Sequence, residues 1–592
     1  MKAIKPAIPL CSLWLLSIVL LITPPVIGQS RHSQSPPNPY ADLIIESEKY
    51  FSDRLKTDEI VGLSAAIILD GNVIWKKGFG YADQLTKRPM TVNTVVNIGS
   101  VTKTFTALSV MQLEERGLVD ISKPLAIYLP YFHPLTRPGI QLDSVTVRSL
   151  LTHTSGIQPD IWRNSDLGTG NYTDVLGFIN QTYLVYPSGL AGLYSNAGYN
   201  ILGHMIRDVT RSEYADYVRQ HIFKVLGMKH SGFAMDRLRN RTKIYAYGQQ
   251  AIEYELRDIA SGGIYTTMND FIRYAIGLLQ AYRGESAALL KQATVQKMFT
   301  LQNTQVPIET NKKGLGWFMF QNDSTFAVYH AGSAGFTHAK LLLIPGQNAA
   351  LLVMTNTAEG GQAAEEFCFN QLPRFGLRIP DLFPAPLPQS VGIPQERVII
   401  PDSTLETYRG IYAESNSYNV VKPTSHQLTL TNGGQKFVLK PVSETEFIPS
   451  EVKGKDTIPR LNQRIIFKRF HGNYYLFRRV NKREYSLGYR LKPIDVGQWA
   501  KKIGVYEHFG YQLLIGDSKF KRAELSISAD SVLMLQLKTL GSSYTIPLDA
   551  INASCALSSG VNSGFGGYNV VFGEDSLYHI LEFAGLSFRM PK

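Results

Sequence analysis

The sequence predicts a mixed α/β domain followed by a region built almost wholly from β-strands. Within residues 45–378, one hairpin pattern near the start and another near the end enclose a long stretch of helical patterns. Residues 403–592 instead alternate apolar and polar residues between frequent turn signals. Early strands, a helical middle and late strands favour one sheet whose first and last strands pair.

The expected elements follow from local patterns of apolar and turn-forming residues. An apolar period of about 3.6 residues predicts a helix, whereas β-like runs on either side of an Asp-Gly pair predict a hairpin. In chain order, we expect a helix over Tyr40–Leu55, a hairpin of Leu63–Leu69 and Val73–Lys76 around Asp70-Gly71, helical patterns with loops, and a hairpin of Ala339–Ile344 and Ala349–Thr355 around residues 345–348.

A proline-rich segment separates the two regions. Six prolines occur from Pro380 to Pro401, which is typical of a stiff linker. We therefore expect a linker at 379–402. In the β-rich region, Tyr408–Tyr412 resembles Lys502–Tyr506, so two copies of a small antiparallel unit are one expectation. A single sheet with a chance match is the alternative.

The composition is that of a globular protein with a sizeable core, because 44% of the 592 residues are apolar and 18% are charged. The net charge of +12 is scattered, so a nucleic-acid partner is not expected. The three cysteines, Cys11, Cys368 and Cys555, form no zinc motif, and no metal is expected. Whether Cys368 and Cys555 pair is left open.

The N-terminus has the pattern of a secretory signal peptide. Lys2 and Lys5 precede an apolar run over residues 8–22, and Val26-Ile27-Gly28 offers a cleavage site before Gln29. We expect a signal peptide at 1–28 and a flexible leader at 29–44, with an uncleaved anchor as the alternative. Either outcome implies export to the periplasm or the extracellular space.

A serine and a lysine stand three residues apart at the start of a predicted helix. Ser100 follows Gly99, and the helical pattern runs to Arg116 and stops at Gly117. Ser100 would thus lie at a helix N-terminus, with Lys103 on the same face. A lysine in an apolar place can lose its proton near neutral pH and then activate the serine hydroxyl as a nucleophile.

This spacing alone is a weak signal. Ser450/Lys453 and Ser518/Lys521 have it too, but they lie in the β-rich region, where residues three apart point to opposite faces of a strand. We expect these to be ordinary strand or turn residues. For Ser100 the structural alternative is a helix N-cap with an exposed lysine.

Two further motifs carry polar groups. In Tyr194-Ser-Asn196, the phenol can act as an acid or base if a neighbouring Lys⁺ lowers its pKa, and the amide can hold a substrate amide. His330-Ala-Gly332 precedes the last hairpin, where a glycine lets a substrate approach the backbone. The structural alternatives are Asn196 capping a helix and a strand-edge histidine bonded to backbone.

In this order, the motifs resemble the serine β-lactamase and penicillin-binding-protein superfamily, and most closely its class C β-lactamase-like branch of D-aminopeptidases, D-alanyl carboxypeptidases and esterases. The resemblance covers roughly residues 45–378 and implies the β-lactamase/transpeptidase-like fold, an antiparallel sheet flanked by helices with a helical sub-domain. The all-β tail resembles accessory domains of some members. Further matching landmarks are Val61–Gly71, Lys77–Asp83, Val145–Gly156, Ala260–Asp270 and Gly314–Trp317.

The resemblance also implies roles for single residues. The catalytic residues would be Ser100, Lys103 and Tyr194. The substrate-binding residues would be Asn196, His330, Gly332 and Ser333. Ser100 would be the acylated nucleophile and Lys103 its proton partner, while the backbone N–H groups of Ser100 and Ser333 would form the oxyanion hole. No cofactor is implied.

The chain departs from typical β-lactamases at His330-Ala331-Gly332, where they carry Lys-Thr-Gly. A lysine anchors a substrate carboxylate, whereas an imidazole is mostly neutral at pH 7 and Ala331 lacks a hydroxyl donor. We therefore expect an exported serine hydrolase acting on an ester or a small, D-amino-acid-type peptide amide through acyl-Ser100. Esterase and peptidase are equally open, and efficient penicillin or cephalosporin hydrolysis is not expected.

Other functions stay open at this point. They are a true β-lactamase, a D-alanyl carboxypeptidase, and a catalytically silent ligand-binding or sensing protein on the same scaffold. The size of the β-rich region also raises the hypothesis that it shapes or covers the active-site mouth. The expected partner is a small-molecule or peptide substrate. Cell-envelope association and the oligomeric state are left open.

Overall fold

The computed structural model describes residues 39–165, 170–309, 311–377, 398–480, 483–510, 520–539, 541–560 and 565–592. The predicted signal peptide, most of the leader, residues 379–397 of the linker and Ser518 lie outside these ranges. Across the described ranges, no helix is long and apolar enough to cross a membrane.

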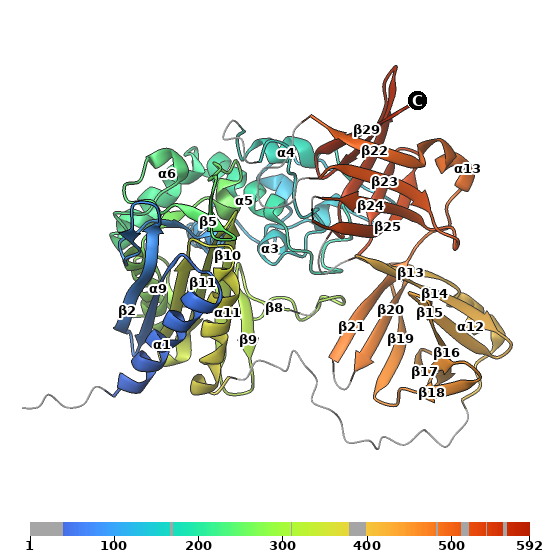
Figure 1. Cartoon of the computed structure of the whole chain (residues 1–592), viewed down its shortest axis with the longest axis horizontal. Helices are drawn as coiled ribbons and strands as arrows, with labels where there is room; N and C mark the ends of the chain where they lie inside the picture. Colours follow the sequence, from blue (N-terminus) through green and yellow to red (C-terminus); the bar gives the residue numbers. More distant parts are fainter. Residues whose placement is uncertain are drawn as a thin grey trace, which may run out of the picture. The chain divides into compact units, whose positions relative to one another are not determined.

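An antiparallel sheet forms the centre of the first domain and has the predicted pairing of early and late strands (Figure 1). β1 (Gly62–Leu69) pairs with β12 (Ala349–Thr355), with Leu63 opposite Thr355. In the described residues the strand order is β3-β2-β1-β12-β11-β10-β9-β8. The other strands are β2 (Asn72–Asp83), β3 (Arg88–Pro89), β8 (Lys312–Lys313), β9 (Phe318–Gln321), β10 (Phe326–Ala334) and β11 (Thr337–Ile344).

Both predicted hairpins are present. Asp70 and Gly71 adopt φ angles of 50° and 76°, the pair of positive values that a tight two-residue turn requires. At the second hairpin, Pro345–Gln347 forms a 3-10 turn and Asn348 follows at φ 50°. The sequence therefore located both turns correctly, because their residues favour this backbone geometry.

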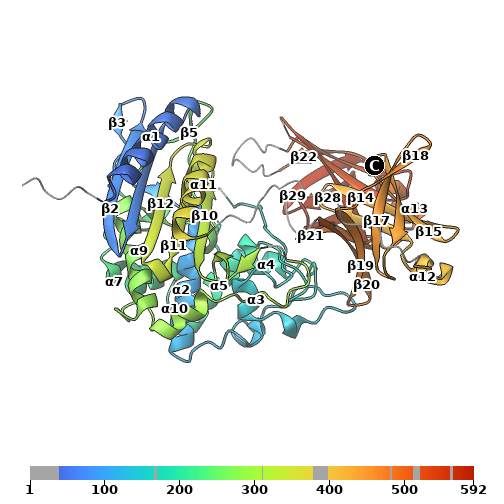
Figure 2. The same ribbon diagram turned by 90° about the horizontal axis from the view of Figure 1, so that it is seen from below.

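Helices cover the two faces of this sheet. α11 packs on β11 and β12, whereas α9 packs on β12 and β1 (Figure 2). Successive residues of β11 point to opposite faces, so Lys340 lies 3.8 Å from Glu365 of α11 while Leu341 joins the core cluster that contains Phe271 of α9. Phe51 of α1 also reaches α11, with its ring centroid 4.6 Å from that of Phe367.

The helices of this domain begin and end as follows in the described residues: α1 (Ala41–Thr57), α2 (Thr102–Glu115), α3 (Val147–Leu151), α4 (Asp174–Ile179), α5 (Asn196–Thr210), α6 (Tyr214–Val218), α7 (Lys224–Leu226), α8 (Ile259–Gly262), α9 (Met268–Arg283), α10 (Gln292–Met298) and α11 (Gly360–Asn370). Two short strand pairs accompany them, β4 (Val96–Asn97) with β7 (Tyr265–Thr266) and β5 (Ile244–Ala246) with β6 (Gln249–Ala251). Since α1 starts at Ala41, the last residues assigned to the flexible leader are helical, which corrects that boundary.

α2 runs through the core of the domain. Every residue from Thr102 to Leu113 is buried, polar ones included. The Phe105 ring stacks on Tyr274 of α9 at 3.7 Å, and the Thr106 hydroxyl donates to the Ala260 carbonyl at 2.7 Å. These contacts fix the helix on all sides, and the turn that precedes it is fixed with it.

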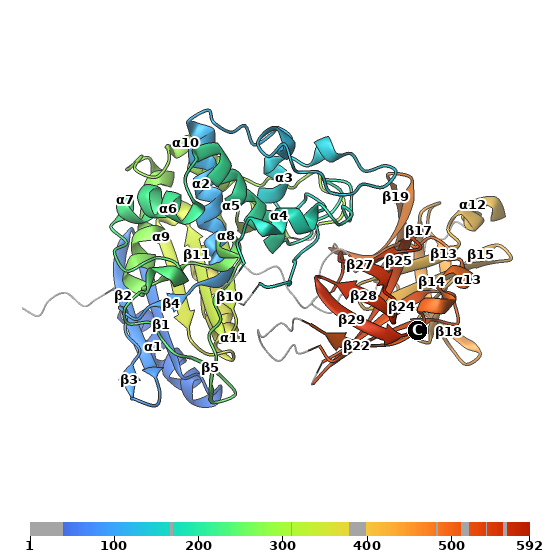
Figure 3. The same ribbon diagram turned by 90° about the horizontal axis from the view of Figure 1, so that it is seen from above.

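Two closed antiparallel sheets make up the described part of the β-rich region (Figure 3). In the first, β13 to β21, the ring closes because β16 also pairs with β17. Its strands are β13 (Gly410–Glu414), β14 (Ser417–Thr424), β15 (Gln427–Asn432), β16 (Gln435–Pro441), β17 (Glu446–Lys453), β18 (Asp456–Pro459), β19 (Gln463–Phe470), β20 (Asn473–Val480) and β21 (Arg483–Arg490), after α12 (Asp402–Thr407). The second closes by pairing of β22 with β29. Its strands are β22 (Gly504–Phe509), β23 (Arg522–Ile527), β24 (Leu533–Lys538), β25 (Ser543–Asn552), β26 (Cys555–Ser558), β27 (Asn569–Glu574), β28 (Tyr578–Phe583) and β29 (Leu586–Pro591), after α13 (Val496–Trp499).

The two closed sheets begin in the same way. Each follows a short helix and starts at a glycine with an unusual φ angle, 154° at Gly410 and 152° at Gly504. In the same strands, the hydroxyls of Tyr412 and Tyr506 each donate to the carbonyl four residues earlier, at 3.0 and 2.7 Å. This shared start is the geometry that two repeated units would have.

Cys368 and Cys555, whose pairing the sequence left open, both lie in the described residues. Cys368 in α11 and Cys555 in β26 are buried free thiols. No disulfide therefore joins the two within the described structure.

Candidate active site

The turn before α2 places Ser100 beside a cavity. Gly99–Val101 form a single 3-10 turn that leads into the helix, with Gly99 at φ 50°. The cavity has a volume of about 1010 Å³. Ser100 lines it together with Tyr194, Phe318, His330, Gly332 and Ser333.

Lys103 is fully buried and contacts three oxygen atoms. Its Nζ lies 2.9 Å from Ser100 Oγ, 2.6 Å from Asn196 Oδ1 and 2.8 Å from the carbonyl oxygen of Ser261. Asn196 Oδ1 and the Ser261 carbonyl oxygen can only accept, so each takes one N–H group of the amine. A neutral amine then has its lone pair left for the proton of the Ser100 hydroxyl.

Burial also sets the protonation of Lys103. It lowers the pKa of the amine to about 7, an effect that the negative charges of Asp160 and Asp258 partly oppose. A large fraction of Lys103 is therefore neutral at pH 7. The group can accept a proton at neutral pH, as its predicted role requires.

Tyr194 packs against Lys103, with the ring centroid 4.9 Å from Nζ. Burial raises the pKa of the phenol, and a hydrogen bond with Ser100 partly offsets this. The expectation that a neighbouring Lys⁺ lowers this pKa is therefore wrong, because desolvation of the phenol dominates. Tyr194 can donate a proton at neutral pH, whereas Lys103 is the better acceptor.

Asn196 begins α5, and both ends of its amide are held. Oδ1 accepts from Lys103, and Nδ2 donates to Asp160 Oδ1 at 2.9 Å. Ser195, not Asn196, caps the helix, since its Oγ accepts from the Gly198 N–H at 2.9 Å. The amide of Asn196 is thus available to Lys103.

β10 passes close to the Ser100 turn because a glycine in each segment, Gly332 and Gly99, lies against the backbone of the other segment. A Cβ on Gly332 would lie 1.9 Å from the Ile98 carbonyl oxygen, and a Cβ on Gly99 would lie 2.5 Å from the Ser333 nitrogen. The sequence prediction explained Gly332 as room for a substrate. In the structure the Cβ side of Gly332 lies against the protein's own backbone, while Gly332 also lines the cavity.

Residues 330–334 of β10 form an open strand edge in the described structure, because β9 pairs with the strand only up to Tyr329. A two-residue loop joins β10 to β11, which makes Ala334 and Thr337 the hydrogen-bonded pair. By alternation, Ser333 occupies a non-hydrogen-bonded position, and its N–H points away from β11. This N–H lies next to Gly99, where the predicted oxyanion hole needs a donor.

His330 is buried and neutral. Burial lowers its pKa to about 3, and its Nδ1–H donates to the Ala331 carbonyl oxygen at 2.6 Å. The ring lies 5.4 Å from that of Phe318 and 6.4 Å from that of Tyr194. The site therefore has a neutral group where typical β-lactamases have a lysine, as the sequence predicted.

The cavity does contain a lysine on another strand. Lys340 of β11 has its Nζ 4.6 Å from the ring centroid of Tyr329 and 4.0 Å from that of Phe369. It lies 3.8 Å from Glu365, on the face of the sheet toward α11. Its charge is therefore already matched by a carboxylate of the protein.

Three groups at the site were missed by sequence reasoning. His153 accepts the Ser195 N–H on Nδ1 at 3.0 Å, and its ring lies 4.3 Å from that of Tyr194. It was part of a landmark segment but had no assigned role. Ser261 also lies in a landmark segment, Ala260–Asp270, without an assigned role. Asp160 carries no sequence signal, and only the fold brings these two residues to Lys103 and Asn196.

An antiparallel sheet whose open strand edge faces a serine in the turn before a helix and a lysine on that helix is the architecture of a β-lactamase-type acyl-transfer scaffold. A family model described as Beta-lactamase matches residues 48–367, more than half of the chain. The chain therefore belongs to the Beta-lactamase family, whose members are generally serine hydrolases.

Two curated relatives each match just over half of this chain. Protein flp of Staphylococcus aureus (strain MW2) is 28% identical over 327 residues, which are 53% of this chain and 62% of flp. The chain thus matches less than two thirds of flp's length. A Bacillus subtilis (strain 168) protein named as a penicillin-binding protein, PbpX, is 28% identical over 330 residues, 54% of this chain and 77% of PbpX.

Solved structures show the same fold. The octameric penicillin-binding protein homologue from Pyrococcus abyssi aligns with a TM-score of 0.51 at 21% identity, covering 73% of this chain and 98% of that one. SurE, solved with D-Leu, aligns with a TM-score of 0.54 at 22% identity, covering 76% of this chain and all of SurE. At these identities the likeness concerns the fold alone.

Proposed function

We propose that this chain is an exported serine hydrolase that cleaves ester or small peptide amide bonds through an acyl-Ser100 intermediate. The observation that carries the proposal is the buried amine of Lys103. It lies between the Ser100 hydroxyl and two acceptor oxygens, and burial lowers its pKa to about 7. A surface N-cap serine with an exposed lysine would have neither property.

The geometry supports a two-step acyl transfer. Ser100 Oγ bonds to the substrate carbonyl carbon while its proton passes to Lys103 Nζ. The carbonyl oxygen becomes an oxyanion, held by the N–H groups of Ser100 and Ser333. When the C–O or C–N bond breaks, the leaving group departs with a proton delivered through Tyr194. Water then repeats the sequence on the acyl-enzyme, releasing the acid and restoring Ser100.

The surroundings narrow the substrate class. The open edge of β10 offers backbone groups to an extended peptide or amide, which favours substrates with a carbonyl beside the scissile bond. The neutral His330 offers no positive charge to a carboxylate, which argues against efficient penicillin or cephalosporin hydrolysis. SurE has been solved with D-Leu, so D-amino-acid peptides are a class to test beside esters.

Export is part of the proposal and rests on the N-terminal sequence pattern, which lies outside the described residues. Cell-envelope association would follow from an uncleaved anchor. Comparing the N-terminal sequence of protein from the culture medium with that of the envelope fraction tests both outcomes, because cleavage before Gln29 leaves that residue first.

The first experiment measures turnover of a p-nitrophenyl butyrate-type ester, a D-alanyl peptide and a chromogenic cephalosporin. Wild type is compared with Ser100→Ala, and Ser450→Ala is the matched control because Ser450 has the same spacing to a lysine within β17. We expect turnover of an ester or peptide that only Ser100→Ala abolishes, and an acyl adduct on wild type by intact mass. Turnover unchanged in Ser100→Ala, or silence without an adduct, would refute the proposal.

A further inference from the structure

A carboxylate outside the sequence motifs lies behind the catalytic lysine. Asp160 belongs to the loop after α3, and its Oδ1 accepts from Asn196 Nδ2 at 2.9 Å. The other end of the same amide accepts from Lys103 Nζ at 2.6 Å. Asp160, Asn196, Lys103 and Ser100 thus form one continuous chain of hydrogen bonds.

This chain fixes which way the Asn196 amide faces. The oxygen and nitrogen ends of an asparagine have nearly the same shape but opposite hydrogen-bonding roles. The ionised form of Asp160 can only accept, so it requires the nitrogen end. The oxygen end must then face Lys103. The flipped amide would put two acceptors together at Asp160 and an NH₂ group against Lys103.

Asp160 also differs from the other carboxylate near Lys103. Asp258 has an ion pair, with Arg257 Nε at 2.6 Å. Asp160 has hydrogen bonds but no ion pair in the described part of the chain, and its Oδ2 lies 3.5 Å from the Tyr568 hydroxyl. Burial raises the pKa of Asp160 to about 7. The other titratable or charged groups that face Lys103 or Asp160 are Tyr194, Tyr199, His153, His330 and Arg257.

We propose that Asp160 is a positioning residue for acyl transfer: it orients the Asn196 amide so that its oxygen faces Lys103, and it places a negative charge behind that amide. The inference rests on the proposed function, because the amine it orients is the proposed proton acceptor. The negative charge of ionised Asp160 favours the protonated form of Lys103, so Asp160 raises the pH at which the amine becomes a base.

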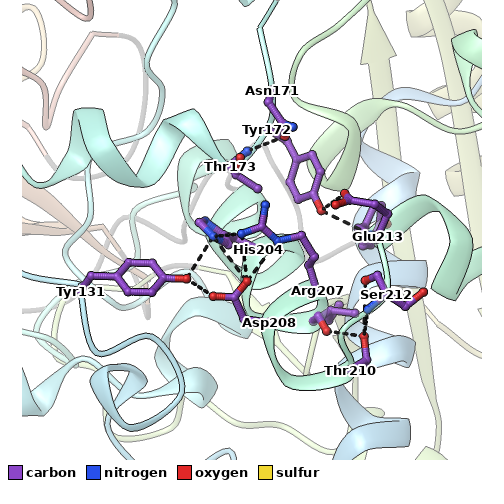
Figure 4. Close-up of polar contacts among 12 residues, drawn as sticks. Tyr131, Asn171, Tyr172, Thr173, His204, Arg207, Asp208, Thr210, Ser212 and Glu213 are labelled. Carbon is purple, nitrogen blue, oxygen red and sulfur yellow. Dashed lines mark hydrogen bonds and ion pairs between the residues drawn. The ribbon is translucent and has the colours of Figure 1, made fainter.

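Two substitutions separate the two effects. In Asp160→Asn the new side chain still offers an oxygen to Asn196 Nδ2, so the orientation is kept and the charge is lost. Asp160→Ala loses both. Asp208→Asn is the matched control, because it removes a carboxylate from the far end of α5, where Asp208 contacts Tyr131, His204 and Arg207 (Figure 4).

The first readout is the titration of Lys103 itself, which requires no turnover. Protein with ¹³C at the lysine Cε is titrated by NMR, and the Lys103 signal is assigned by its loss in Lys103→Met. We expect Asp160→Asn to move the midpoint to lower pH by about one unit. Asp208→Asn should leave it unchanged. An unmoved midpoint in Asp160→Asn would overturn the inference.

The second readout is the pH profile of kcat/KM on the best substrate. We expect the acid limb of Asp160→Asn to move down with the lysine midpoint, while Asp160→Ala loses roughly 10- to 100-fold at every pH because the amide is no longer held. A purely structural role would lower the activity of both variants without moving the limb, and would refute the inference. Wild type without Ser100-dependent turnover would refute the proposed function, and the lysine titration would still decide whether Asp160 controls Lys103.

Discussion

Replacing Lys103 with methionine tests the proposed base and its energetic cost together. Methionine has a similar length and no charge, so the buried space stays filled while the amine is lost. Removing a positioned general base typically costs about 10²- to 10⁴-fold in rate. We therefore expect acylation of Ser100 to fall by at least about a hundredfold.

The same substitution changes how stability depends on pH. The pKa of Lys103 falls from 10.5 in the unfolded chain to about 7 in the folded protein. Between these values the unfolded state binds more protons, so the free energy of unfolding rises with pH. For this one group the rise from pH 7 to pH 9 is about 2 kcal/mol. Lys103→Met should lack this rise, because it has nothing to titrate.

The assay is thermal and urea unfolding of both proteins at pH 7 and pH 9, followed on the transition of the catalytic domain. Because other groups titrate equally in both proteins, the difference between wild type and variant isolates Lys103. At pH 7 the variant gains from losing the desolvated amine, but it leaves Asn196 Oδ1 and the Ser261 carbonyl without their donor, at about 1–3 kcal/mol each. The same pH dependence in both proteins, or acylation within tenfold of wild type, would refute the reasoning.

Three further predictions follow. First, kcat/KM of wild type should rise with pH through about 7 as Lys103 loses its proton, and a flat profile from pH 5 to 9 on a pH-stable ester would contradict this. Second, Gly332→Ala would force a Cβ to within 1.9 Å of the Ile98 carbonyl oxygen. We therefore expect a roughly 10²-fold loss of turnover and a lower melting temperature. Normal rates in a folded variant would argue against a tight oxyanion site. Third, Trp162 stacks at 5.8 Å on Phe520, which precedes β23 and belongs to the core of the second closed sheet, so Trp162→Ala should lower the melting temperature while Trp162→Phe keeps most of it. Equal melting temperatures for the two variants would show that this contact is not stabilising.

The elements that sequence predicted correctly are those with a local cause. Asp70-Gly71 favours a tight turn wherever it occurs, and the alternation on either side of it defines two strands. The helix after Ser100 ends at Glu115, two residues before Gly117, which adopts φ 70°, a conformation that glycine tolerates without strain. Such signals lie within a few residues of the feature that they specify.

The parts that sequence missed depend on contacts across the chain. Asp160 meets Asn196 over 36 positions, and Ser261 meets Lys103 over 158. No periodicity connects residues at such separations. A second reason for the glycine at 332 was missed for the same reason, since the backbone that lies against it belongs to Ile98.

The β-rich region, which we expected to shape or cover the active-site mouth, contacts a different part of the catalytic domain in the described residues. The described residues that line the Ser100 cavity all lie between 100 and 370. The second closed sheet instead contacts the loop that carries Asp160, where Asn569 Nδ2 donates to Gln158 Oε1 at 2.9 Å. Its described contacts therefore bear on the position of Asp160 more directly than on the cavity wall.

The second Ser-x-x-Lys pattern shows why spacing alone does not define such a site. Ser450 and Lys453 both lie in β17, where residues three apart point to opposite faces. Ser450 is fully buried, while the Lys453 side chain is 58% exposed. On a helix the same spacing brings Lys103 Nζ to 2.9 Å from Ser100 Oγ, and burial then lowers its pKa. The helix supplies the direction and the core supplies the basicity, so a nucleophile requires both.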